Sequence, residues 1–376
     1  MDTTIKKIAL FVPAWFPCSF FEEQQNTYKS EYEVINIYGT CEWLSKKKQI
    51  REILSFKSNY YLMSSIANRL IEVAVRCPKR KKESSWANTI SRISERIGQL
   101  VLSETHGKTP NVIYIQSVSE IAIFVAEWAR KNGIPIVLAE HVLYIRRGND
   151  YITRRKEKLY SSSNQVFCVS NYLYRNLLTS GFNMQSVKIV GNLINSYAVP
   201  EDWNMIKKNG KIIFVAGHIS DKDMPTFCKV ANRLFDSNVS IDIYGLTGEE
   251  RIGNNCLRDN VYNNVTFMGK VSHKMLLEKY NEYSLLLSTS ISETFGLSVA
   301  EAIAHGTPVV CTDSGGICDF VNDNNGMIVN LKDVDAIITA INVVMHRQYD
   351  CKRMSSFILK QYGVLNYMKN TRLDIL

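Results

Sequence analysis

Short apolar runs alternate with helical segments along most of this chain, and the alternation starts again after residue 210. Apolar runs of this length between helices are typical of parallel strands that are buried on both faces of a sheet. Two such series predict an α/β protein with two doubly wound domains in tandem. The expected strands are Lys7–Val12, Glu33–Tyr38, Asn111–Gln116, Ile134–Glu140, Gln165–Ser170, Lys211–Gly217, Val239–Gly245, Val265–Gly269, Ser284–Ser290 and Thr307–Asp313.

The domain boundary is expected in a segment rich in turn-forming residues. Residues 194–210 contain Pro200 and end near Lys-Lys-Asn-Gly, so we interpret them as a linker. The first domain then covers residues 1–193 and the second covers residues 211–358. Such domains bind ligands outside the carboxyl ends of their strands, so we expect the two to face a central cleft. Residues 42–105 have little strand character and abundant helix formers, which predicts a helical insertion.

Composition argues against several classes of protein. The sequence has no run of about eighteen apolar residues, so we expect no segment that spans a membrane. The apolar run near the N-terminus lacks a small-residue cleavage site, which favours a buried strand over a signal peptide. The nine cysteines show neither CxxC nor Cys/His spacing. This predicts reduced thiols in a cytoplasmic protein and no metal site.

The net charge of +9 is concentrated in the first half of the chain. Residues 1–195 hold 27 Lys and Arg against 16 Asp and Glu, whereas the remaining residues hold 18 against 20. The densest basic run is Arg76–Lys82. It is either a solvated loop or a surface for an anionic membrane or a phosphate-bearing partner. Zinc-finger spacing and aromatic RNA-binding patterns are absent from the sequence, so nucleic acid is not an expected partner.

The segment Ser292–Val310 carries the clearest chemical signal. A helix is expected to start at Gly296 or Leu297, directly after a strand and a short loop, and to stop at Gly306 before Pro308. The start of such a helix presents unpaired backbone N–H groups and positive dipole density, which suit a diphosphate.

Two glutamates, Glu293 and Glu301, lie eight positions apart in this segment. The spacing does not suggest a glycosidase pair that shares one bond. It suits two hydroxyl-bearing groups on either side of a diphosphate, a sugar and a ribose, because carboxylates accept hydrogen bonds from vicinal hydroxyls. The alternative is an ordinary helix with Glu301 on its surface.

The stretch Val265–Val329 resembles the donor domain of glycosyltransferase family 4. The matching motifs are the turn Gly269–Ser272, the E-x7-E pair, the Gly-Thr-Pro-Val-Val run, and Gly315–Gly316 followed by Asp319. Weaker matches extend over most of the chain, at Pro13–Gln24, Ala139–His141 and Gln165–Asn195, and resemble enzymes of bacterial surface polysaccharides. The resemblance implies the GT-B fold with two Rossmann-like domains, retention of anomeric configuration and no metal or other cofactor. It also implies that residues 359–376 form a helix that crosses back to the first domain.

The resemblance also implies roles for particular residues. Glu293 would contact hydroxyls of the donor sugar, and Glu301 would hold the ribose. The diphosphate would lie against the backbone of Thr294, Phe295, Gly296 and Leu297. His141, after a strand of the first domain, would touch the sugar near its anomeric centre. The alternative interpretation is that His141 is a loop histidine whose hydrogen bond is satisfied within the protein.

Two departures from the family pattern concern the phosphate site. After Gly217, where the family has arginine, this chain has His218, and Lys222 stands near the lysine position. A neutral imidazole holds phosphate less well than guanidinium, so Lys222 is expected to be the main cation. The loop Pro13–Phe21 contains no glycine, so it meets the donor through side chains or serves the acceptor. Its aromatic residues either stack on a sugar or lipid or pack in the core.

The resemblance implies a hexosyltransferase that uses a nucleoside diphosphate sugar, with a UDP-sugar favoured. The acceptor would be a saccharide, expected on a polyprenyl diphosphate and bound by the first domain during synthesis of lipopolysaccharide or capsule. The enzyme would then be cytoplasmic and peripheral on the inner face of the plasma membrane. Two alternatives share the fold: a nucleotide-sugar 2-epimerase and a non-catalytic subunit that binds sugar nucleotides.

Overall fold

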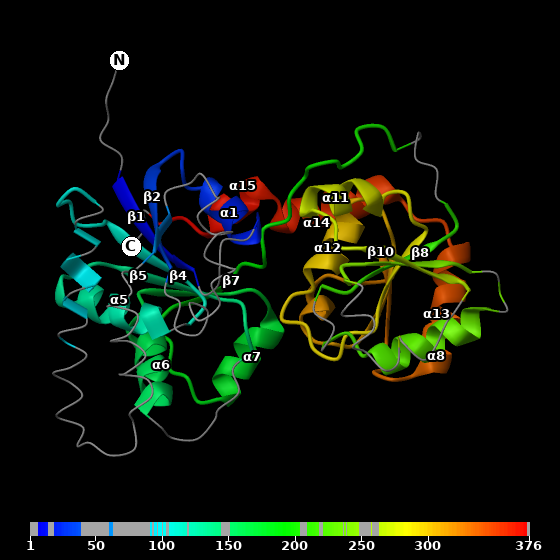
Figure 1. The fold of residues 1–376 in the computed structure, drawn as a ribbon, viewed down its shortest axis with the longest axis horizontal. Coiled ribbons are helices and arrows are strands. Elements are labelled where there is room, and N and C mark those ends of the chain that lie inside the picture. The colour runs from blue at the N-terminus through cyan, green and yellow to red at the C-terminus, as the bar shows by residue number, and fades with distance from the viewer. Residues whose placement is uncertain are drawn as a thin grey trace. The chain divides into compact units, whose positions relative to one another are not determined.

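The computed structural model divides the chain into two compact units, each built around one parallel sheet (Figure 1). The first unit comprises Met1–Val190 with Met368–Leu376, and the second comprises Gly191–Tyr367. The structure describes residues 7–13, 19–38, 60–62, 91, 94–95, 97–99, 101–102, 105–118, 120–143, 151–203, 209–217, 221–235, 237, 239–247, 257 and 263–373.

Within the described residues, the first unit contains a seven-stranded sheet in the order β3-β2-β1-β4-β5-β6-β7, with every neighbouring pair parallel. Consecutive strands extend outward from β1 in both directions, so the order reverses between β1 and β4, as in doubly wound folds. The strands are β1 (Lys7–Pro13), β2 (Tyr32–Tyr38), β3 (Tyr60–Leu62), β4 (Val112–Gln116), β5 (Ile136–Glu140), β6 (Gln165–Cys168) and β7 (Val187–Ile189). The helices with described bounds are α1 (Ser19–Asn26), α5 (Glu120–Lys131), α6 (Tyr151–Ser162) and α7 (Asn171–Thr179).

Most of residues 42–105, where the sequence predicts a helical insertion, lies outside the described residues, but this range contains strand β3. It adds an edge strand in parallel to β2, with Tyr60 opposite Asn36. Its sequence, Tyr-Tyr-Leu, has the aromatic character that strands favour. The basic run at residues 76–82 lies outside the described residues.

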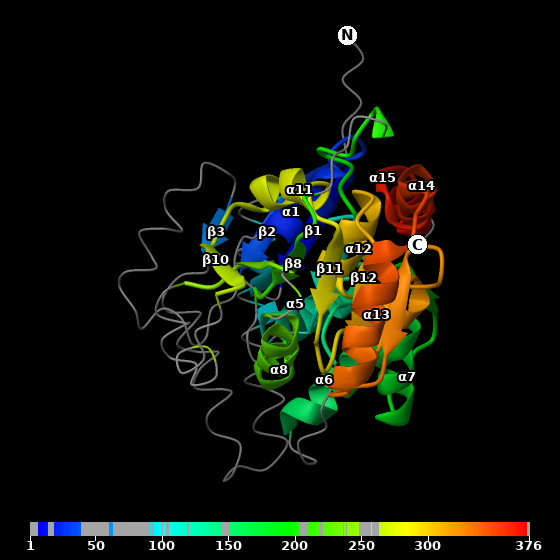
Figure 2. The same ribbon diagram turned by 90° about the vertical axis from the view of Figure 1, so that its right-hand side faces the viewer.

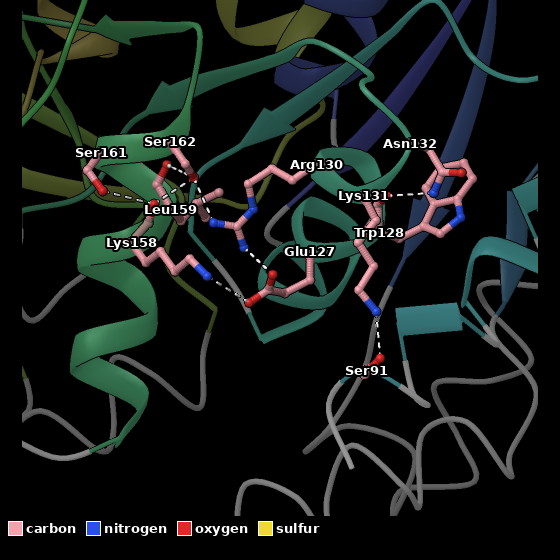
Figure 3. A network of polar contacts seen from close by, with 10 residues as sticks. All are labelled: Ser91, Glu127, Trp128, Arg130, Lys131, Asn132, Lys158, Leu159, Ser161 and Ser162. Atoms are coloured by element: carbon pink, nitrogen blue, oxygen red, sulfur yellow. Dashed lines mark hydrogen bonds and ion pairs between the residues drawn. The ribbon is translucent and has the colours of Figure 1, made fainter. Parts of the chain in front are cut away.

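The first unit is held together by an aromatic core and by polar contacts between its outer helices. Phe11 stacks on Tyr114 with ring centroids 4.8 Å apart. Glu127 on α5 forms one ion pair with Arg130 at 2.6 Å and a second with Lys158 on α6 at 3.6 Å. Figure 3 shows these contacts side by side, so this network joins α5 to α6.

The second unit contains, among the described residues, a six-stranded parallel sheet in the order β10-β9-β8-β11-β12-β13. Its order reverses between β8 and β11. The strands are β8 (Ile212–Val215), β9 (Ile241–Tyr244), β10 (Val265–Gly269), β11 (Leu285–Ser288), β12 (Val309–Thr312) and β13 (Gly326–Val329). The helices are α8 (Met224–Phe235), α11 (His273–Tyr280), α12 (Leu297–Ala304), α13 (Val334–His346) and α14 (Cys351–Tyr362), with a 3₁₀ helix at Gly316–Asp319.

Helices α8 and α13 pack on one face of this sheet, where their apolar residues share a core with alternate residues of β8, β9 and β11. Helix α12 contacts β11 and β12 and also packs against α11 and α14 (Figure 1). This arrangement places the start of α12 just after the carboxyl end of β11. The short strands β11 and β12 and the buried helix α12 consist mainly of apolar residues, as the sequence pattern predicts.

The C-terminal segment differs from the single helix predicted over residues 359–376. Helix α14 ends at Tyr362, and α15 (Val364–Asn370) follows after Gly363 (Figure 2). The chain then continues without helix, and the carbonyl of Thr371 accepts a hydrogen bond from Tyr28 at 3.2 Å. Leu373 joins the core of the first unit. No described helix is both long enough and apolar enough to cross a membrane.

Candidate functional site

The loop that carries Glu293 is bracketed by the segment after β12. The N–H of Glu293 donates to the carbonyl of Ser314 at 2.7 Å, and the N–H of Gly316 donates to the carbonyl of Glu293 at 2.8 Å. A Cβ on Gly316 would lie 2.1 Å from the carbonyl oxygen of Thr294. Only glycine therefore permits this close approach of the two backbones.

Glu293 forms an ion pair with Lys222. The Nζ of Lys222 lies 2.6 Å from Oε1 of Glu293, and the two side chains are 11% and 20% exposed. The hydroxyl of Ser290 accepts from Lys222 at 3.1 Å and donates to Glu293 at 2.9 Å. The hydroxyl of Thr289 donates to the backbone carbonyl of Lys222 at 2.5 Å. The end of β11 thus holds the lysine and the glutamate together.

Helix α12 begins without a side-chain cap. Its N-cap residue, Gly296, has φ 93° and makes no side-chain cap hydrogen bond. A Cβ at this position would lie 2.5 Å from Cγ2 of Ile317, so both the backbone angle and the space require glycine. No described residue accepts a hydrogen bond from the N–H groups of Gly296, Leu297 or Ser298. These donors and the helix dipole form a place for an anion beside Glu293.

Phe295 anchors this loop in the core. Its ring is 1% exposed and lies 5.2 Å from the ring of Phe320 and 5.1 Å from the ring of Tyr362. Its side chain is therefore unavailable to a ligand, and only its backbone could contribute to a phosphate site. The loop stays close to the 3₁₀ helix through this packing.

Glu301 lies inside α12 and is bound by two side chains of α11. Its Oε1 is 2.7 Å from Nε2 of His273, and its Oε2 accepts from the hydroxyl of Tyr280 at 3.1 Å. The carboxylate is 9% exposed, so Glu301 is not the surface residue of the alternative interpretation. Burial, and then the charge and hydrogen bond of Glu301, raise the pKa of Tyr280 well above its usual range.

The second unit therefore brings together a cation, two carboxylates and backbone N–H donors around one loop and helix. An ionised carboxylate only accepts hydrogen bonds, whereas the lysine and the helix start attract negative charge. The arrangement can bind a phosphorylated ligand that carries hydroxyl groups on both sides of its phosphates. The described residues include no group of three or more His, Cys, Asp and Glu placed to hold a metal ion.

His141 lies in the first unit, directly after β5. Its side chain is nearly buried, and its ring lies 5.6 Å from the ring of Phe21 in an edge-on arrangement. The backbone N–H groups of His141 and Val142 both donate to Oε1 of Glu140, at 2.9 and 3.0 Å. Glu140 thus fixes the turn on which His141 stands.

Glu140 is itself buried, at 2% exposure. It also accepts from the hydroxyls of Ser117 and Tyr160, each at 2.5 Å. Ser117 has φ 70°, an unfavourable angle for a residue other than glycine, and its hydrogen bond to Glu140 stabilises it there. Burial, and secondarily the charge of Glu140, raises the pKa of Cys168 to about 12.

Other predicted residues contribute less to the described geometry. Gly217 follows β8, and a Cβ there would meet no atom within 4 Å, so space does not require glycine. His218 lies outside the described residues, as do Trp15 and Phe16 of the first loop. Phe21 is fully buried and belongs to the core.

Sequence analysis missed three residues that the structure brings to the site. Ser290 bridges Lys222 and Glu293, and His273 and Tyr280 hold Glu301. A signal was present in the seven-residue spacing of His273 and Tyr280, which places both on one face of a helix. The partner that this face contacts depends on packing between helices that are distant in sequence.

Comparison with known proteins shows similarity to glycosyltransferases. Residues 200–361 match the family model described as glycosyl transferases group 1. An uncharacterized glycosyltransferase of Methanocaldococcus jannaschii is 28% identical over 188 residues, which cover 48% of this chain and 46% of that protein. The aligned region thus covers about half of this relative, and no more than 51% of each of three other curated relatives.

Two solved structures are similar over nearly the whole chain. Sucrose-phosphate synthase of Thermosynechococcus elongatus has a TM-score of 0.71 at 13% identity, with 98% of each chain covered. HepE of Anabaena in complex with UDP and glucose has a TM-score of 0.67 at 14% identity, with 98% of this chain and 99% of that chain covered. At such identities the likeness concerns the fold. The chain has the GT-B fold, and its residues 200–361 are similar to the group 1 glycosyl transferases.

Proposed function

We propose that this chain is a retaining, metal-independent glycosyltransferase that moves a hexose from a nucleoside diphosphate sugar to a saccharide acceptor. The observation that carries the proposal is the Lys222–Glu293 ion pair beside the uncapped start of α12. A cation and helix N–H groups suit a diphosphate, and the adjacent carboxylate suits a sugar hydroxyl. A UDP-sugar is the favoured donor because the similar HepE structure contains UDP and glucose.

In this proposal each group of the second unit has one task. The diphosphate accepts hydrogen bonds from the N–H groups of Gly296 and Leu297, and Lys222 balances its charge. Glu293 orients the sugar through its hydroxyls. Glu301 holds the hydroxyls of the ribose. Thr294 and Phe295 contribute backbone, and a contact of Gly217 and His218 with the phosphates stays a prediction.

The proposed reaction proceeds on one face of the sugar. The bond between the anomeric carbon and the diphosphate oxygen breaks, and its electron pair stays on the diphosphate. The acceptor oxygen bonds to the anomeric carbon from the same face and passes its proton to the departing diphosphate. Lys222 and the start of α12 stabilise the negative charge that develops there. Because Lys222 and Ser290 bind the carboxylate of Glu293, we assign Glu293 to orientation and not to nucleophilic attack.

The acceptor is proposed to be a polyprenyl-diphosphate-linked saccharide of surface polysaccharide synthesis, such as lipopolysaccharide or capsule. The positive charge of residues 1–195 supports a peripheral position on the inner, anionic face of the plasma membrane. Vesicle co-sedimentation tests this part, and equal binding to neutral and anionic vesicles contradicts it. Contact of His141 with the donor sugar remains a prediction, which His141→Ala tests through turnover.

Incubation of the chain with labelled UDP- and GDP-sugars, with and without acceptor, tests the main proposal. Nucleotide release that depends on the acceptor, and that persists in excess EDTA, supports a metal-independent transferase. Conversion of one sugar nucleotide into another without acceptor identifies a 2-epimerase instead. Binding without turnover identifies a non-catalytic subunit.

A further inference from the structure

Helix α11 offers two hydrogen-bond donors to the same carboxylate. His273 stands at its first position and Tyr280 at its last, seven residues on, so both lie on the face that packs against α12. Each reaches a different oxygen of Glu301, at 2.7 Å from Nε2 of His273 and 3.1 Å from the hydroxyl of Tyr280. Glu301 is thus held at both oxygens by one neighbouring helix.

This double contact determines what Glu301 can do. An ionised carboxylate accepts about four hydrogen bonds, two on each oxygen, and here one on each oxygen is supplied by α11. The two contacts fix the plane of the carboxylate while each oxygen retains acceptor capacity. Two adjacent hydroxyl groups match two such acceptors.

We infer that His273 is a positioning residue that orients Glu301 toward the vicinal hydroxyls of the nucleotide ribose, an inference that rests on the proposed function. An ionised carboxylate cannot donate, so Nε2 of His273 must carry hydrogen in this contact. His273 therefore acts through Glu301 and sets the preference for ribose over deoxyribose.

His273 and Tyr280 differ in how much they also support the fold. Tyr280 is completely buried and its ring lies 5.8 Å from that of His305, so its removal also disturbs packing. The side chain of His273 is 26% exposed, and its neighbour Ser272 caps α11 through the N–H of Met275. His273 can therefore be replaced with little loss of core contacts, which makes it the cleaner probe.

The test measures the dissociation constants of UDP and of 2′,3′-dideoxy-UDP for the full chain by calorimetry. For the parent chain we expect UDP to bind roughly 10-fold to 100-fold more tightly, as for hydrogen bonds to a charged group. In His273→Ala we expect UDP binding to weaken roughly 5-fold to 10-fold while dideoxy-UDP binding stays unchanged. His273→Gln should restore part of the preference because its amide can donate to Glu301.

Two further variants complete the design. Lys274→Ala is the matched control, because Lys274 lies over the ring of Tyr197 and should leave both constants unchanged. Glu301→Gln should abolish most of the ribose preference. In steady-state assays, His273→Ala should raise KM for the donor and leave kcat unchanged.

Two results would overturn the inference for different reasons. If His273→Ala weakens both nucleotides equally, or neither, while Glu301→Gln removes the ribose preference, His273 does not position Glu301 and the proposed function stands. If the parent chain binds neither UDP nor GDP, the proposed function fails and the inference fails with it. Thermal unfolding of His273→Ala and His273→Gln verifies that both variants are folded.

Discussion

The first unit carries the buried Glu140 at the carboxyl end of β5, and the second carries the partly buried Glu293 after β11 and the buried Glu301 inside α12. The two units satisfy these carboxylates differently. In the first unit Glu140 accepts hydrogen bonds from two hydroxyls and two backbone N–H groups. In the second unit Glu293 faces the ammonium group of Lys222, and Glu301 faces His273 and Tyr280.

This difference separates a structural carboxylate from carboxylates that a ligand can use. Four neutral donors, two hydroxyls and two backbone N–H groups, tie Glu140 to one conformation, and that conformation fixes the turn on which His141 stands. The partners of Glu293 are the side chains of Lys222 and Ser290, and on ligand binding Lys222 can exchange the carboxylate of Glu293 for a phosphate oxygen. We therefore expect substitution of Glu140 to act mainly on stability and substitution of Glu293 to act mainly on turnover.

The largest effect is expected for Lys222→Ala. Loss of a cation that stabilises the leaving group should lower kcat by about 100-fold to 1,000-fold, with a smaller loss of donor affinity. Steady-state kinetics measure both quantities. Lys211→Ala is the control. Lys211 lies just before β8, and its ion pair with Asp242 at 3.2 Å is away from the site. Unchanged turnover in Lys222→Ala would refute the assignment.

Gly316→Ala should disturb the loop that carries Glu293. The new Cβ would overlap the carbonyl of Thr294, so the backbone must shift, at a cost of about 1–3 kcal/mol in the free energy of unfolding. Denaturant unfolding measures this cost. Gly217→Ala has open space and should change the free energy of unfolding by less than about 0.5 kcal/mol. Equal stability of the two variants would contradict the close approach of Gly316 to the loop that carries Glu293.

Glu140→Gln and Glu293→Gln test the comparison directly. The first places an amide NH₂ against donors and should lower the free energy of unfolding by about 1–3 kcal/mol. The second keeps an acceptor for Ser290 and loses only a partly exposed ion pair, so stability should fall by less than about 1 kcal/mol while turnover falls strongly. Thermal unfolding and kinetics on both variants provide the data. A larger loss of stability in Glu293→Gln than in Glu140→Gln would show that the distinction between the two carboxylates is wrong.

The smallest effect concerns the thiol of Cys318 in the 3₁₀ helix beside the Glu293 loop. Partial desolvation, and then the hydrogen bond to Asp313, raise the pKa of the exposed Cys318 to about 11. The reactive thiolate is therefore scarce at neutral pH, and its alkylation rate should rise as the pH approaches 11. Asp313→Asn should lower this pKa and speed alkylation, which mass spectrometry can follow at this residue. Rapid alkylation of the parent protein near neutral pH would argue against the raised pKa.

Much of the fold follows from local sequence patterns. The apolar runs predicted as strands coincide with strands of both sheets, and α12 begins at Leu297 as its glycine and apolar spacing indicate. Strands β7 and β13 were not predicted because each is short and only partly buried. The break at Gly363 was missed because helix-forming residues flank it.

The candidate site was predictable only in part. The glutamate spacing marked Glu293 and Glu301, but their partners come from other segments. Lys222 lies 71 positions from Glu293, and His273 lies 28 from Glu301. Such pairs form only when the sheet order and helix packing are in place. The periodicity of the sequence therefore does not predict them.

The central claim is that a sugar nucleotide binds to the second unit with its diphosphate at the start of α12. A crystal structure of the chain with UDP-glucose bound tests it most directly. We predict that the diphosphate accepts hydrogen bonds from the N–H groups of Gly296 and Leu297, with the ribose on Glu301 and a sugar hydroxyl on Glu293. A nucleotide bound elsewhere, or a helix start covered by protein atoms, would contradict the account.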